Sequence, residues 1–160
     1  MVKYLVLKLV MQVNFRKIIL VWLALYTILS AQTPYILTKF SSLYPLVEIY
    51  TKKVPQSYKA EITEIIKEYA KEMNISTAGY SSRPLAIIIS RVAIGETLVL
   101  KVQLLLGEEV RRLDDNEEVF ALTYQKEDIF EVNDLEEDLI DSVEYLLEEF
   151  KDQYIEDNEE

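Results

Sequence analysis

The chain has 160 residues and contains neither cysteine nor histidine. Imidazole and thiolate groups are the usual general bases, nucleophiles and soft metal ligands near neutral pH. Their absence excludes Cys-His proteases, Ser-His-Asp hydrolases, Cys/His zinc sites and thiol redox chemistry. A disulfide framework is excluded as well, so the apolar core alone must hold the fold together.

Glycine is also scarce, with three residues that stand apart from one another. Phosphate-cradling loops and dinucleotide fingerprints both need closely spaced glycines. We therefore expect no nucleotide or other cofactor, and the sequence singles out no catalytic, cofactor-binding or metal-ligating residue. Half of the residues are hydrophobic, which is too many for a disordered chain and enough for one domain.

Charge is distributed unevenly along the chain. The formal net charge is -11, yet residues 1–31 contain four basic side chains and no acidic one. Residues 32–113 hold 11 basic and 8 acidic side chains, whereas residues 114–160 hold 2 basic and 20 acidic ones. Phosphate backbones require positive surface, so we expect no nucleic acid as a partner.

The N-terminus has the form of a secretory signal peptide. An uncharged apolar run at residues 18–29 follows two basic residues and ends just before Ser30 and Ala31. This run is short for a membrane-spanning helix, which needs roughly 20 apolar residues. We expect residues 1–31 to be removed by cleavage after Ala31, with Met11 as a candidate true start. An uncleaved anchor and a buried core helix are the alternatives.

Cleavage and anchoring both carry the rest of the chain out of the cytoplasm, because the basic side of an apolar segment stays inside. We therefore expect an exported, periplasmic protein, or an inner-membrane-anchored one if the leader is retained. Lipid attachment of the bacterial lipoprotein kind is impossible because no cysteine follows the apolar run.

Patterns after the leader predict four strands and two helices. An irregular lead-in at residues 32–45 mixes Pro, Thr, Ser and Lys with scattered apolar residues. β-branched and apolar runs predict strands at residues 46–51, 85–94, 98–106 and 119–124. Apolar stripes with a period of 3.6 predict helices at residues 58–73 and 133–155, before an acidic tail at 156–160.

The order β-α-β-β-β-α predicts an α+β domain over residues 46–155. Two helices with one apolar stripe each can cover one face of a small, mostly antiparallel sheet, which gives a two-layer sandwich. The nearly continuous apolar run at 85–94 predicts a strand covered on much of both faces. Gly107 predicts a bulge or a strand end, and Asn133 with Glu136 resembles a helix capping box.

Carboxylates are the plentiful chemical groups of the acidic C-terminal third. Hard cations such as Ca²⁺ want several oxygen ligands, and the sequence offers them at residues 114–118 and on one helix surface at Asp134, Glu137, Asp138 and Asp141. A solvated acidic face is the favoured interpretation. A hydrolase that uses carboxylates alone is a remote alternative, because it needs one carboxyl group in an apolar pocket.

Tyrosine occurs 11 times, and it is enriched at protein interfaces because it combines apolar area with a polar tip. Predicted core stripes account for Tyr58, Tyr69 and Tyr154. The better interface candidates fall in predicted loops, at Tyr35, Tyr44 and Tyr80. Arg111 and Arg112 lie beside the acidic turn, where we expect them to balance charge within the chain.

Residues 83–110, 119–124 and 128–132 resemble segments of uncharacterised exported proteins of Campylobacter-like bacteria. The resemblance spans most of the predicted domain and implies export, with no activity to transfer. The order of elements is also similar to that of small α+β domains of periplasmic assembly lipoproteins and of the amino-terminal part of the translocation protein TolB. That similarity concerns the fold alone, and the missing lipidation cysteine departs from the lipoprotein pattern.

The favoured hypothesis is a non-enzymatic cell-envelope protein that acts by binding an envelope protein. A sheet edge and loop tyrosines would form the contact surface, while the acidic helix would set solubility and the charge of the partner. An acidic divalent-cation-binding module, using the carboxylates from Asp114 onward, is the alternative from a different class.

Processing has a direct optical test, because the single tryptophan, Trp22, lies inside the predicted leader. We expect the native protein to show tyrosine fluorescence without a tryptophan band, since cleavage after Ala31 removes the indole. Emission spectra excited at the red edge of indole absorption check this. A clear tryptophan band in the purified native protein would mean that the leader stays attached.

Overall fold

The computed structural model describes residue 37, residues 39–79 and residues 81–158, all within one compact unit, Tyr35–Glu160. The predicted leader, its cleavage point and the candidate start at Met11 lie outside the described residues, as do Tyr35 and Tyr80. Neither of the described helices is both long and apolar enough to cross a membrane.

Six elements follow the lead-in in the predicted order, which confirms the α+β class. They are β1 (Tyr44–Ile49), α2 (Tyr58–Glu72), β2 (Pro84–Ile94), β3 (Thr97–Arg111), β4 (Glu118–Glu131) and α3 (Leu135–Asn158).

Two of these strands run past their expected ends. β3 continues to Arg111 through a bulge between Leu106 and Gly107, so the glycine marks a bulge and not a strand end. β4 continues to Glu131 through a highly charged stretch, because backbone pairing with β3 sustains the strand where the side-chain pattern alone does not.

The strands form one sheet in the order β1-β2-β3-β4. β1 runs parallel to β2, with Tyr44 opposite Pro84 and Ile49 opposite Ile89, and α2 makes the crossover between them. The pairs β2-β3 and β3-β4 are antiparallel hairpins. The predicted mostly antiparallel sheet is therefore confirmed, with its first strand at an edge.

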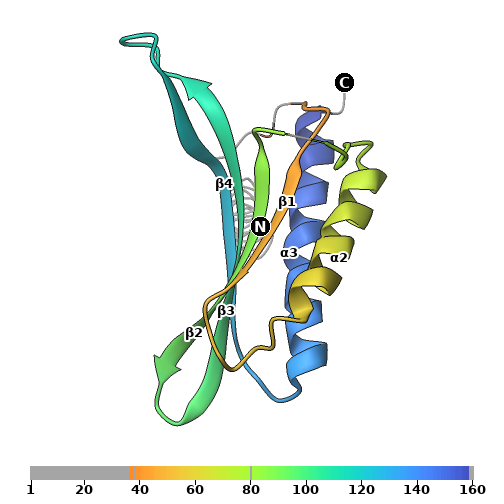
Figure 1. Ribbon diagram of the computed structural model, residues 1–160, viewed down its shortest axis with the longest axis vertical. Coiled ribbons are helices and arrows are strands. Elements are labelled where there is room, and N and C mark those ends of the chain that lie inside the picture. Colours follow the sequence, from red (N-terminus) through yellow and green to blue (C-terminus); the bar gives the residue numbers. More distant parts are fainter. Residues whose placement is uncertain (1–36, 38, 80, 159–160) are drawn as a thin grey trace, which may run out of the picture. The chain divides into compact units, whose positions relative to one another are not determined.

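Both helices lie on the same side of the sheet (Figure 1). Alternate strand residues point into one core with the buried helix stripes, because successive side chains of a strand point to opposite faces. The sheet contributes Val47, Ile49, Leu85, Ile87, Ile89, Leu100, Val102, Leu104, Leu106 and Tyr124. The helices contribute Ile62, Ile66, Ala70, Leu139, Val143, Leu146, Leu147, Phe150 and Tyr154.

The lead-in is more than an irregular connection, because α3 ties it to the core. Leu37 and Phe40 are buried, and the hydroxyl of Tyr154 donates a hydrogen bond to the carbonyl of Phe40 at 3.2 Å. Asp157 accepts the Leu37 N–H at 2.7 Å, and the Asn158 amide donates to the Leu37 carbonyl at 2.7 Å. Part of the expected acidic tail is thus the helical clamp that holds the lead-in.

The capping of α3 differs from the expected pair of Asn133 and Glu136, because the cap lies one residue later, at Asp134. Asp134 accepts the backbone N–H groups of residues 136 and 137, at 3.0 and 3.2 Å. Asp138 reaches back and accepts those of Asn133 and Asp134, at 2.6 and 2.9 Å. Asn and Asp are nearly equal as caps, so the sequence alone left the position open to error.

One lysine joins the two helices. Lys151 of α3 pairs with Glu148 of its own helix at 2.7 Å and with Glu72 of α2 at 3.1 Å. Its ammonium group also lies 5.1 Å from the ring centroid of Tyr69. Hydrogen bonding to Glu148 raises the pKa of Lys151, so this contact between the helices keeps its charge throughout the physiological range.

Tyr124 of β4 lies in the core under α3, with 2% of its surface exposed. Its ring meets that of Phe150 edge to face, with centroids 5.1 Å apart. Burial raises the pKa of Tyr124 to about 12, and the nearby Glu149 carboxylate adds to the effect.

The raised pKa of Tyr124 predicts a loss of stability at alkaline pH. The contribution is complete below pH 10, where folded and unfolded chains both hold the phenol proton, and it disappears as the pH rises through about 12. We expect the free energy of unfolding to fall by about 2–3 kcal/mol more in the wild type than in Tyr124→Phe over this interval. Urea melts at pH 9 and 12 measure it, and parallel pH profiles would contradict it.

Candidate interaction surface

The sheet face that points away from the helices carries a second set of apolar side chains. We call it the open face, because no described helix lies against it (Figure 1). On this face Ala86 lies opposite Leu105. The adjacent pair along the strands, Leu85 and Leu106, points to the other face and into the core. The apolar members of the open face are Leu46, Ala86, Ile88, Val92, Ile94, Val99, Leu105, Phe120, Leu122 and Ile129.

The sequence predicts that β2 is covered on both faces. The described residues cover it on one face, the face toward the helices. On the open face Ala86 is buried by its sheet neighbours, while Ile88 and Val92 keep intermediate exposure. Antiparallel sheets usually turn polar residues toward water on the side away from their helices. An open face this rich in apolar residues is therefore a candidate contact surface.

The largest group of exposed apolar side chains on the open face lies on β4. Phe120, Leu122 and Ile129 expose 59%, 54% and 50% of their surface. β4 is also an edge of the four-stranded sheet, since among the described strands only β3 pairs with it. An exposed edge strand offers backbone N–H and C=O groups to a further strand, so apolar contact and hydrogen bonding are available side by side.

The bulge shapes this surface. Gly107 is buried beneath the ring of Phe120, and a Cβ atom at position 107 would overlap with that ring. An aromatic ring that covers a glycine on a neighbouring strand compensates for the side chain that the glycine lacks. The ring of Phe120 therefore contacts the backbone at Gly107, although the residue exposes 59% of its surface.

The hairpin of β3 and β4 projects past the helices at the end that carries its turn (Figure 1). Arg111 pairs with Glu118 at 2.7 Å across the strands. Arg112 pairs with Asp115 and, at 2.9 Å, with Glu117 inside the turn. The arginines therefore balance the acidic turn within the chain, as expected, and occupy most of the carboxylates considered as calcium ligands at residues 114–118.

The other acidic candidates serve mainly to start α3. Asp134 and Asp138 accept backbone N–H groups at the helix start, while Glu137 and Asp141 are exposed on its outer side. Within the described part of the chain, no group of three or more acidic residues is placed to hold a metal ion. The geometry gives no support to the divalent-cation alternative.

The tyrosines divide between the core and the surface. Tyr154 is buried, and Tyr58 and Tyr69 are partly buried against the core, as predicted. Of the loop candidates only Tyr44 is described, and it begins β1 with 49% exposure. Sequence reasoning missed Tyr50, which follows β1 and is 70% exposed, because a residue at the predicted end of a strand carries no signal of its final exposure.

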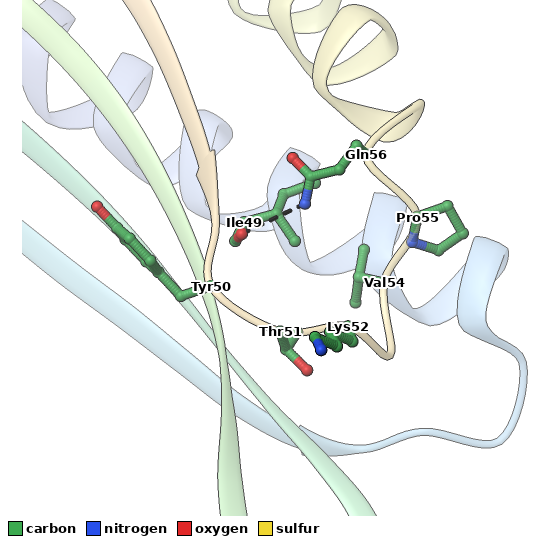
Figure 2. A pocket seen from close by; sticks show the side chains of 7 residues that line it. All are labelled: Ile49, Tyr50, Thr51, Lys52, Val54, Pro55 and Gln56. Carbon is green, nitrogen blue, oxygen red and sulfur yellow. Dashed lines mark hydrogen bonds between the residues drawn. The ribbon is translucent and has the colours of Figure 1, made fainter.

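Tyr50 borders a hollow of about 370 Å³ that the β1–α2 connection forms (Figure 2). The Gln56 amide closes it by donating a hydrogen bond to the Ile49 carbonyl at 3.4 Å. Tyr50 points away from the side chains of Val54 and Gln56. Lys52 is the only lining residue that is charged near neutral pH, so the hollow has no acid–base pair for proton transfer.

Comparison with known proteins finds no family model that matches the chain and no curated protein with a similar sequence.

The contact between Gly107 and Phe120 predicts a specific coupling. We expect Gly107→Ala to lower the free energy of unfolding by about 1–2 kcal/mol, because the new methyl group displaces the ring. In a Phe120→Ala background, the loss of unfolding free energy caused by Gly107→Ala should be smaller by about 1 kcal/mol, since the ring is no longer there. Denaturant melts of the four variants measure this coupling, and additive effects would contradict the contact.

Proposed function

We propose that this chain is an exported, non-enzymatic protein of the bacterial cell envelope that acts by binding another protein. The proposal of export rests on the signal-like sequence of residues 1–31. One observation carries the proposal of binding: three large apolar side chains stand half exposed along a single edge strand, at Phe120, Leu122 and Ile129.

The free edge of β4 favours one kind of partner. A segment that adds to the free edge of β4 gains backbone hydrogen bonds along the strand, and its alternate side chains extend the open face. Apolar residues would lie beside Phe120, Leu122 and Ile129. The proposed occupant is therefore an extended segment of a different protein, apolar on the side that continues the open face.

Charge favours a basic partner over a second copy of the chain. Acidic side chains outnumber basic ones on the open face, where the register places Glu48, Glu109, Glu118, Glu127 and Glu131 together with Lys101 and Arg111. Lys59 of α2 also pairs with Glu48, at 2.9 Å. Without residues 1–31 the chain holds 13 basic and 28 acidic side chains. Two such surfaces repel each other, whereas lysine or arginine around an apolar strand would complement them.

The described acidic residues support binding more than catalysis. Asp115 and Glu117 of the turn pair with Arg112, and Asp134 and Asp138 cap α3. Acid–base catalysis by carboxylates needs one group whose pKa is raised in an apolar pocket. Among the described residues, a raised pKa is found for Tyr58, Tyr69, Tyr124 and Lys151, and structural contacts within the fold account for each of them.

Site-specific crosslinking in the native host tests the proposal. A photoreactive phenylalanine analogue replaces Leu122 on the open face or, as a control, Glu68 on the exposed side of α2 in the full-length chain. We expect one discrete adduct with a different protein from position 122 and none from position 68. Ile129→Asp should reduce the yield at position 122 by about tenfold, because it places a charge in the apolar contact.

Two results would count against this function. Similar adducts from both positions would mean that the open face has no special role. An adduct of twice the mass of the chain would identify a second copy as the occupant, contrary to the charge argument.

A further inference from the structure

A small cleft opens between the C-terminal half of β4 and the first turns of α3, on the helix side of the sheet. Its volume is about 280 Å³. Asp128 and Phe130 of β4 line it, and they pair with the core residues Val102 and Leu100, which places their side chains toward α3. The cleft therefore lies on the opposite side of the sheet from the open face.

Carboxylates dominate the lining of the cleft. Asp138 and Asp141 come from α3 and Asp128 comes from β4, and none of the described lining residues is basic. Glu131 also borders the cleft, but the strand register turns its side chain to the open face. The ion pairs of the described residues involve none of the first three carboxylates. Negative charge from two elements thus converges on one hollow whose lining holds no positive side chain.

A buried hydroxyl group gives a second and independent indication of a ligand. Ser142 of α3 is 4% exposed and lines the cleft, and its Oγ has no hydrogen-bond partner within the described residues. Buried polar groups in folded proteins are nearly always hydrogen-bonded. An N–H donor in the cleft would supply the missing bond, since a hydroxyl oxygen accepts as readily as the hydroxyl group donates.

Aromatic rings complete the walls. Phe130 and Tyr145 both line the cleft, and Tyr145 is 49% exposed. The face of an aromatic ring attracts a cation and also covers hydrocarbon. The ring of Tyr145 has a cation nearby within the chain, since the ammonium group of Lys126 lies 5.9 Å from its centroid.

These walls suit an organic cation better than a metal ion. Acidic residues surround the hollow, but no three of the described ones are grouped so that they could hold a metal ion. Two aromatic rings and a single hydroxyl are poor ligands for Ca²⁺ or Mg²⁺, which require several oxygens at short distance. An alkylammonium group has N–H donors for the carboxylates and the hydroxyl, and methylene groups for the rings.

We propose that the cleft between β4 and α3 binds a primary alkylammonium ion. The ammonium group lies among Asp128, Asp141 and the Oγ of Ser142, and the methylene chain lies against Phe130 and Tyr145. A free diamine and a lysine side chain of another polypeptide both have this chemistry. The site is independent of the open face, so it stands or falls apart from the proposed protein binding.

Calorimetric titration of the protein as isolated from cells tests the site. The probes are 1,4-diaminobutane and N-acetyl-lysine amide, each at 20 and 150 mM salt. We expect saturable binding at one site for at least one probe. Tighter binding of the diamine indicates a free diamine as the ligand, and tighter binding of the lysine amide indicates a side chain. No saturable heat with either probe at low salt would overturn the proposal.

Matched variants locate the binding. The double variant Asp128→Asn and Asp141→Asn should weaken it by about tenfold or more, because two charge-assisted hydrogen bonds are lost. Glu136→Gln with Glu144→Gln removes the same charge from exposed positions of α3 outside the cleft and should change the affinity by less than about twofold. Equal weakening in both double variants would overturn the site.

Two further measurements keep the test decisive if the first double variant folds poorly. Ser142→Ala removes only the hydroxyl group from the cleft, and it should weaken probe binding several-fold while circular dichroism stays unchanged. Unchanged affinity in this variant would contradict the placement of the ammonium group. Titration with CaCl₂ tests the remaining outcome. The organic-cation assignment would be overturned if the protein bound Ca²⁺ more tightly than either probe and lost this binding in the double variant of Asp128 and Asp141.

Discussion

The burial of one sheet face under two helices is the constraint on which the rest of the structure depends. The chain has no cysteine, so no disulfide supplements the apolar core. α3 contributes most to it from the helix side, with six buried apolar residues along its 24. At about 25 cal/mol per Å² of apolar surface removed from water, such stripes are the main source of stability for a domain of this size.

The same constraint explains where the charges lie. A helix that buries one stripe must solvate the remainder, and in α3 the remainder is acidic. Lys151 offsets part of this charge at the junction with α2, where it pairs with Glu72 and Glu148. Toward the start of the helix, Asp128, Asp138 and Asp141 line the cleft, and no lysine is among its lining residues.

The two helices cover one face of the four-stranded sheet and leave the open face uncovered by any described helix. At the β4 edge of the sheet, the β3–β4 hairpin extends beyond the helices (Figure 1). Cross-strand ion pairs and the ring of Phe120 over Gly107 support the hairpin there. A projecting hairpin of two strands is only marginally stable by itself, so these local contacts maintain the surface on which the proposed binding relies.

Patterns that depend on near neighbours were readable from the sequence. The stripe from Leu139 to Tyr154 and the alternation in β3 report burial directly, because helix and strand periodicity decide which side chains share a face. The bulge at Gly107 and the charge balance at Arg112 were likewise local. The capping position was missed by one residue because Asn133 and Asp134 have similar capping strength.

Features that join distant segments were not readable. The parallel pairing of β1, the clamp of Asp157 and Asn158 on Leu37, and the meeting of Asp128 with Ser142 each join residues whose separation no periodicity records. The sequence by itself determined the element types, their order, the buried stripes and the acidic character of the last helix, because these follow from local propensity and patterning. Only the tertiary structure decided which sheet face is left open and which carboxylates share a cleft, because those depend on how the elements pack.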